Sequence, residues 1–202
     1  MQRQRPHVLY LHRTLGAGLA AMLLVAGCTE TITAKTVTLP TPLIEPLPVT
    51  VGVYYSPELR TNEPTVRLPK RCPWCGSSMY KLSVGPAAAA MLERVFAAMF
   101  ERTVVVASRP PLPAGGSDVA AVIEPAITFN VGRDFISIGI YLTLYAADGA
   151  SLKSWSASGT GPGTDAAAAL RDAAAVIMTE FAAQPEVKEW LSSIGEPGGD
   201  GS

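Results

Sequence analysis

Histidine is almost absent from this sequence. The 202 residues include only His7 and His12, and both lie in the first twelve positions. If the N-terminal segment is removed, as the pattern below indicates, the rest of the chain has no imidazole at all. That excludes histidine-based acid–base catalysis, histidine metal ligands and Ser-His-Asp triads. We therefore expect no catalytic residue, no metal site and no cofactor.

A hydrophobic run long enough to cross a bilayer is also missing. The apolar run over 15–26 has about 12 residues, whereas a membrane span needs ~20. It follows three basic residues, Arg3, Arg5 and Arg13, and no acidic residue precedes Glu30. A short apolar run after a positively charged start is typical of a signal peptide, and we assign residues 1–27 to it.

The run ends in Leu24-Val25-Ala26-Gly27-Cys28, with small residues directly before a cysteine. This combination resembles the lipobox of bacterial lipoproteins. The resemblance implies that Cys28 is acylated, becomes the first residue after cleavage and anchors the chain in membrane lipid. Because Thr29 rather than Asp follows the cysteine, it further implies sorting to the outer membrane, facing the periplasm. The alternative is an ordinary secreted protein with a chance cysteine.

Excess positive charge is lacking too. Of the 16 basic and 17 acidic residues, three arginines leave with the signal, so the remaining 175 residues carry a net charge of −4. This balance argues against nucleic acid as a partner. The remaining length suits one domain with a real core. We expect a Thr- and Pro-rich tether over 28–48, one α+β domain over 49–194 and a disordered tail over 195–202.

The periodicity of apolar residues predicts an α+β fold. The sheet is mainly antiparallel with four or five strands, and two long helices pack on one face in the order β-α-β-β-β-β-α. Because proline cannot donate a hydrogen bond to a neighbouring strand, Pro125 predicts that its strand lies at an edge or is bulged there. Gly159 to Thr164 predict a flexible loop, and the alternative is a phosphate-binding loop at the helix N-terminus. The expected strands cover 49–56, 103–108, 118–130 and 136–145 with a hairpin partner after Asp148-Gly149, and the expected helices cover 86–102, 165–183 and a short segment from Pro185.

This order of elements resembles small periplasmic lipoproteins of the YajG, PelC and LpoB kind. Those proteins serve as accessory parts of envelope machinery, so the resemblance implies a non-catalytic accessory role. Two alternatives remain. One is a thiol–disulfide redox protein, and the other is a lipid-binding carrier with a cavity between helix and sheet.

The segment Cys72-Pro73-Trp74-Cys75 is the one constellation that could carry chemistry. Export into an oxidising compartment favours a structural Cys72–Cys75 disulfide that holds a loop. Neighbouring Lys70 and Arg71 would favour a reactive thiolate, so a redox role is an alternative. The Cys-Pro-x-Cys-Gly pattern also resembles one knuckle of a zinc ribbon or rubredoxin, which would need ligands from another chain. The rest of residues 58–83 is expected to be a loop, which leaves room for a short hairpin.

One face of the predicted hairpin carries the candidate binding residues. A two-residue turn at Asp148-Gly149 aligns Leu142 with Trp155 on the core side. Since the predicted helices cover only the core side, we expect the opposite face to bind an envelope protein or a second copy of this chain. The alternative is a solvated sheet face. On this face of the predicted hairpin, Tyr141 pairs with Ser156, Thr143 with Ser154, and Tyr145 with Leu152.

Overall fold

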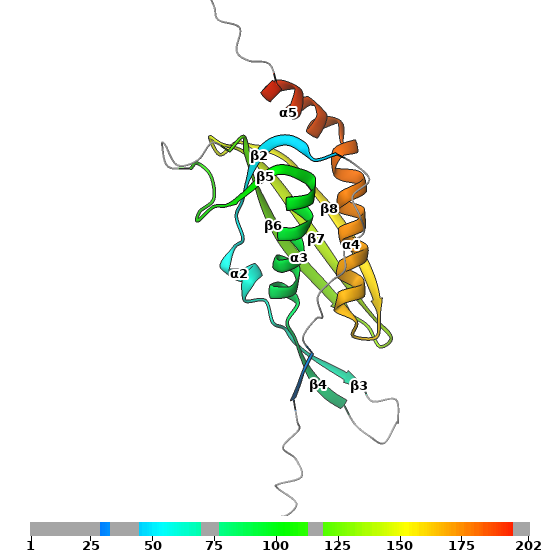
Figure 1. Cartoon of the computed structure of the whole chain (residues 1–202). Helices are drawn as coiled ribbons and strands as arrows, with labels where there is room; N and C mark the ends of the chain where they lie inside the picture. The colour runs from blue at the N-terminus through cyan, green and yellow to red at the C-terminus, as the bar shows by residue number, and fades with distance from the viewer. Residues whose placement is uncertain (1–28, 33–44, 70–76, 113–118, 196–202) are drawn as a thin grey trace, which may run out of the picture.

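The computed structural model describes residues 29–32, 45–69, 77–112 and 119–195, which form an α+β fold. Its main sheet has five strands in the order β5-β2-β6-β7-β8 (Figure 1). β2 runs parallel to β5 and β6, whereas the longer β6–β7 and β7–β8 ladders are antiparallel. The α+β class is therefore as predicted, and the five strands fall within the predicted four or five. The strands are β2 (Leu47–Val53), β5 (Phe100–Val105), β6 (Ala121–Val131), β7 (Phe135–Ala146) and β8 (Ser151–Pro162).

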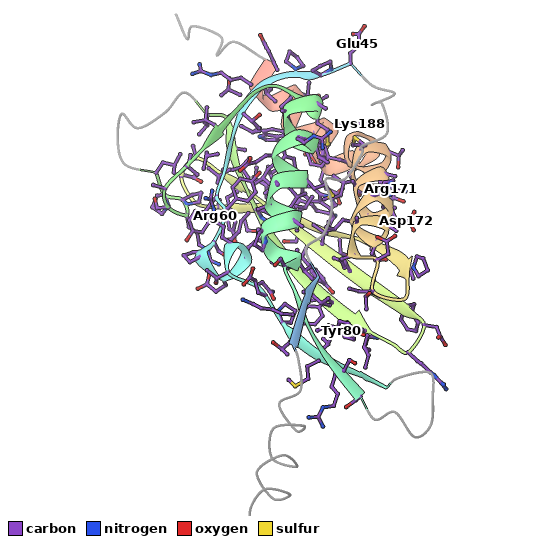
Figure 2. The ribbon with its side chains drawn as sticks, turned by 60° about the horizontal axis from the view of Figure 1, so that its bottom comes forward. Glu45, Arg60, Tyr80, Arg171, Asp172 and Lys188 are labelled. Carbon is purple, nitrogen blue, oxygen red and sulfur yellow. The ribbon has the colours of Figure 1, made fainter. Side chains whose placement is uncertain are left out.

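Helices α3 (Val84–Met99) and α4 (Ala166–Glu180) lie side by side on one face of this sheet (Figure 1). A 3₁₀ turn (Phe181–Ala183) and helix α5 (Pro185–Gly195) follow. Polar residues such as Arg171 and Asp172 lie on the solvent side of α4 (Figure 2). None of the described helices is long and apolar enough to cross a membrane.

The core lies between these helices and the sheet. The inward side chains of β7 are at most 1% exposed, as strict alternation predicts: Ile136, Ile138, Ile140, Leu142 and Leu144. Aromatic rings close one end of this layer. The ring of Phe181 packs edge-on against Phe100 at 5.5 Å and lies 4.8 Å from the ring of Trp155.

A second, three-stranded sheet is formed by β1 (Thr29–Ile32), β3 (Thr65–Pro69) and β4 (Ser77–Leu82), with β4 in the middle. β3 and β4 form the short antiparallel hairpin that the sequence allowed. β1 pairs in parallel with β4, so part of the predicted tether is a strand. The expected loop over 58–83 also overlaps helix α2 (Pro57–Arg60), whose first turn is capped by the Ser56 side chain.

The first long helix ends earlier than its apolar pattern predicts. The pattern runs on to Arg102, but α3 stops at Met99, and Phe100 is already extended with φ −122° and ψ 148°. Phe100 lies one helical turn after Phe96, so the sequence pattern does not reveal the break. The extended backbone places the Phe100 ring in the core against Phe181, where it is 1% exposed.

Pro125 does not place β6 at the edge of the sheet, because β6 lies between β2 and β7. However, β2 pairs only with residues 121–123 of β6 and then leaves the sheet. The Ile123 carbonyl accepts from the Tyr54 amide on the β2 side, and alternation puts the Pro125 nitrogen on that same side. The Pro125 nitrogen, which cannot donate a hydrogen bond, therefore faces a position where β2 no longer pairs with β6.

Most of the predicted glycine loop is in fact the end of strand β8, which runs to Pro162, and only Gly163 and Thr164 form a turn before α4. Gly159 and Gly161 belong to β8 and lie directly under α4. A Cβ atom on Gly159 would come within 2.0 Å of the Ala169 carbonyl oxygen, and one on Gly161 within 2.1 Å of the Asp165 oxygen. These glycines allow a helix to pack closely on a strand. The helix cap is Asp165, which accepts from the Ala168 amide, and not Thr164.

Candidate protein-binding face

The predicted pairing of β7 with β8 is confirmed over most of its length. Tyr141 pairs with Ser156, Thr143 with Ser154, and Leu142 with Trp155 on the core side. The Ser154 hydroxyl donates to the Thr143 hydroxyl at 3.1 Å.

The predicted pairing of Tyr145 with Leu152 is wrong, because Tyr145 pairs with Ser151. The Ala146 amide donates to the Ala150 carbonyl, so the turn has three residues instead of two. Gly149 takes the positive φ of 96° that this turn requires. Leu152 is the extra residue in β8, and it is 40% exposed.

The surface around Tyr141 lies on the side of the sheet opposite to α3 and α4. We call the set Tyr141, Thr143, Ser154 and Ser156 the open face. Tyr141 is 48% exposed, both serines are exposed, and Thr143 is half-buried. An aromatic ring surrounded by hydroxyl groups offers apolar area together with hydrogen-bonding groups, which suits protein recognition.

Tyr145 marks the point where this side of the sheet becomes covered. Next to it, Glu124 of β6 is 8% exposed, and its Oε1 accepts from the Nε of Arg109 at 2.8 Å. The Tyr145 hydroxyl lies 3.4 Å from the other carboxylate oxygen. The Glu124 carboxylate raises the pKa of Arg109 above its usual value, mainly through the hydrogen bond. The expectation that the tyrosine face has no cover within the chain is therefore wrong at this end.

Sequence reasoning missed this ion pair. Arg109 belongs to the predicted turn after β5, and Glu124 lies on a predicted strand 15 residues further on. The signal available in the sequence was the carboxylate of Glu124. This residue pairs with Thr143, so it faces the same side of the sheet as Thr143 and Tyr145.

The three cysteines all fall outside the described residues. The acylation of Cys28 and the Cys72–Cys75 disulfide therefore stay predictions. Within the ranges that the structure describes, no group of three or more His, Cys, Asp or Glu side chains could hold a metal ion.

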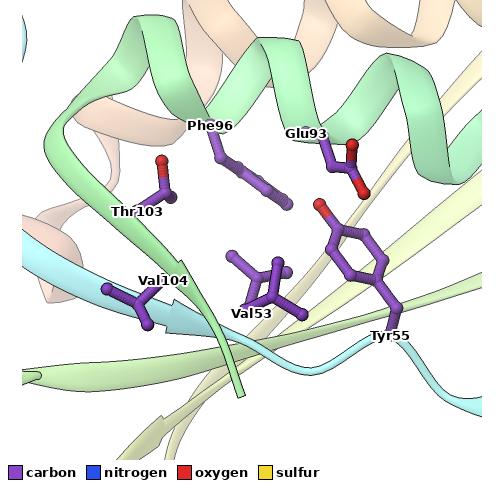
Figure 3. A pocket seen from close by; sticks show the side chains of 7 residues that line it. Val53, Tyr55, Glu93, Phe96, Thr103 and Val104 are labelled. Carbon is purple, nitrogen blue, oxygen red and sulfur yellow. The ribbon is translucent and has the colours of Figure 1, made fainter. Parts of the chain in front are cut away.

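A small cavity lies on the helix-covered side of the sheet, between α3 and strands β2 and β5 (Figure 3). Its volume is about 190 Å³, below the ~300 Å³ at which small-molecule sites usually begin. It is too small to support the lipid-carrier alternative. Its lining residues are Val53, Tyr55, Glu93, Phe96, Thr103, Val104 and Val105.

Comparison with known proteins gives no family model and no curated protein that matches the chain. Several solved structures are similar to it in part, and three of them are described here. Protein XCC0632 from Xanthomonas campestris (DUF330) has a TM-score of 0.49 at 12% identity, covering 82% of this chain and 99% of that one. A PelC variant from Paraburkholderia phytofirmans, solved as a dodecamer, has a TM-score of 0.34 at 16% identity, covering 68% and 93%. An uncharacterized protein has a TM-score of 0.30 at 14% identity, covering 79% and 99%.

Proposed function

We propose that this chain is a lipid-anchored, non-catalytic accessory protein of the bacterial cell envelope. In this proposal acylated Cys28 holds the chain in the outer membrane, and the folded domain faces the periplasm. The open face binds a protein partner. The anchor is supported by the resemblance of residues 24–28 to a lipobox, and the binding role by the geometry of β7 and β8.

The observation that carries the binding role is the exposure of Tyr141. The two long helices lie on the other side of the sheet, and among the described residues the Arg109–Glu124 pair covers the end near Tyr145. The middle of the face leaves Tyr141 48% exposed between side-chain hydroxyls. Tyrosine is among the residues that most often dominate the binding energy of interfaces.

Photo-crosslinking in intact envelopes tests this role. A photoreactive residue in place of Tyr141 should give a crosslinked species, and the mass of the adduct tells a partner protein from a second copy. The matched control is Met79, an exposed apolar residue on β4 that is 39% exposed. Crosslinking at Met79 and none at Tyr141 would contradict the proposal.

The variant Tyr141→Ser should abolish recovery of the crosslinked partner without unfolding the domain. Exposed strand positions span ~1 kcal/mol in stability, so the unfolding free energy should change by at most about that much. Met79→Ser serves again as the control and should retain the partner. Undiminished recovery with Tyr141→Ser would show that the face is only solvated surface.

The anchor is tested separately with Cys28→Ser. This variant should lose labelling by radioactive palmitate and accumulate as unprocessed precursor. Two or more acyl chains are needed for stable anchoring, so the wild-type protein should stay with outer-membrane fractions in a density gradient. Normal processing and unchanged membrane association of Cys28→Ser would refute the assignment.

A further inference from the structure

Strand β5 ends the main sheet and offers hydrogen-bonding groups at its outer edge. Within the part of the chain that the structure describes, β5 pairs only with β2. The Val106 amide donates to the Val53 carbonyl at 3.0 Å, so even-numbered residues of this stretch face β2. The amides and carbonyls of Glu101, Thr103 and Val105 therefore point away from the sheet. An edge of this kind can pair with an added strand.

The cavity described above lies beside this edge, on the side covered by α3. Val53 and Phe96 provide its apolar walls, and Thr103 comes from the edge strand itself (Figure 3). Val105 of the same strand also lines the cavity. Val105 is 57% exposed, so the edge next to the cavity is accessible. A volume of about 190 Å³ suits one long side chain better than a cofactor or a drug-sized ligand.

The polar end of the cavity has acidic character. Glu93 is exposed and is the one charged residue among the seven that line the cavity. Figure 3 shows the Tyr55 hydroxyl directed toward it. Tyr55 is 5% exposed, and burial is the main cause that raises the pKa of its hydroxyl, followed by Glu93. The guanidinium of Arg60 lies over the Tyr55 ring at 5.3 Å and acts in the opposite direction.

We propose that the β5 edge binds an extended peptide segment of a partner protein, which inserts one lysine or arginine side chain into this cavity. The apolar walls would contact the methylene stem, and Glu93 and Tyr55 would meet the charged end. Main-chain hydrogen bonds along Glu101, Thr103 and Val105 give affinity, and the cavity gives specificity. This site is separate from the open face and does not depend on it.

A second copy of this chain does not fit the same site through its own β5 edge. Residues that pair directly across two strands lie on the same face of a sheet. Thr103 pairs with Val51 and Val105 with Val53, so the odd-numbered residues of β5 lie on the cavity side. A second β5 edge would bring Glu101, Thr103 and Val105 to that side, and none of them is basic. The acidic cavity therefore favours a different chain.

The test uses the full chain in detergent micelles and fluorescent seven-residue peptides of alternating threonine and valine with lysine at the centre. The lysine peptide should bind, and the same peptide with glutamate at the centre should bind at least about tenfold more weakly, because like charges repel. Methylating alternate amide nitrogens on the side that faces β5 should abolish binding, whereas methylating the other set should not. No binding of the lysine peptide at millimolar concentration would overturn the proposal.

Variants of the protein complete the test. Glu93→Gln should weaken the lysine peptide about tenfold, and Glu93→Lys should reverse the preference in favour of the glutamate peptide. Glu180→Gln, an exposed carboxylate at the end of α4, is the control and should leave binding unchanged. Equal binding of both methylated sets, or of both central residues, would refute the site. Tyr141→Ser should not affect the peptide, so failure here and failure at the open face are distinguishable.

Discussion

Replacing Gly159 with alanine tests the close packing of helix α4 on strand β8. A Cβ atom at this position would lie 2.0 Å from the carbonyl oxygen of Ala169 and 2.5 Å from the amide nitrogen of Ala173. Ordinary van der Waals contact begins at 3.4 Å. Both neighbouring atoms belong to the helix backbone, so no side-chain rotation can relieve the overlap. The helix itself has to move away from the sheet.

Overpacking of a core usually costs ~1–3 kcal/mol, and here we expect about 3 kcal/mol because a whole helix is displaced. For a domain of this size, each kcal/mol lowers the melting temperature by ~2–4 °C, so Gly159→Ala should lower it by about 6–12 °C. Urea unfolding followed by circular dichroism measures the free energy, and a thermal scan measures the melting temperature.

The matched control is Ser158→Ala, the neighbouring residue of β8. Ser158 is exposed on the opposite side of the sheet, so its loss should change the unfolding free energy by no more than ~0.5 kcal/mol. If Gly159→Ala were as stable as this control, α4 could not lie directly on β8. The assignment of Gly159 and Gly161 to a strand beneath the helix would then be wrong.

The parts of the fold that could be predicted from the sequence depend on local patterns. Strict alternation from Ile136 to Leu144 identifies β7 and its buried side, and the same alternation in the next strand places Trp155 beside Leu142. The turn residues Asp148-Gly149 locate the hairpin. Each of these signals lies within a few residues of the structure that it predicts.

The parts that could not be predicted depend on contacts between distant segments. Gly159 and Gly161 are loop formers by local preference, and only the packing of α4 makes them useful in a strand. Phe100 continues a helical pattern but is extended because its ring packs against Phe181. The pairing of β1 with β4 joins residues about 50 positions apart, and no local pattern indicates it.

The candidate sites divide in the same way. Alternation within one hairpin is enough to place Tyr141 and Thr143 on a common face, so the open face could be predicted. How much of this side of the sheet is covered could not be predicted. Arg109 reaches Glu124 from a connection between strands, and the path of that connection depends on the order of the strands. The β5 edge was equally hidden, since a strand becomes an edge only through the arrangement of the whole sheet.

Three further predictions concern the cysteines, a surface carboxylate and the ion pair that covers part of the sheet. The double variant Cys72→Ser/Cys75→Ser should fold and lose at most ~2 kcal/mol in urea unfolding, since a short ring removes little chain entropy, and wild-type insulin reductase activity would contradict a structural role. Lys81 forms an ion pair with Glu63, and its hydrogen bond lowers the pKa of this carboxyl below the ordinary value of 4.5. The contribution of Glu63 to stability is therefore present above pH 4.5 and is lost as the pH falls through the lowered pKa. Melting temperatures of wild type and Glu63→Gln should therefore differ at neutral pH and converge in acid, and a constant difference would refute this. Arg109→Ala leaves the Glu124 side chain, which is 9% exposed, without its charged partner. Hydrogen bonds to charged groups contribute ~1.5–3 kcal/mol, and because the Arg109 side chain is 65% exposed we expect a loss at or just below the lower end of this range, about 1–2 kcal/mol, in urea unfolding. Adding Glu124→Leu should recover much of that loss, because an apolar side chain needs no partner at this buried position. A double variant less stable than Arg109→Ala alone would show that the carboxylate stabilises the fold through contacts other than the arginine.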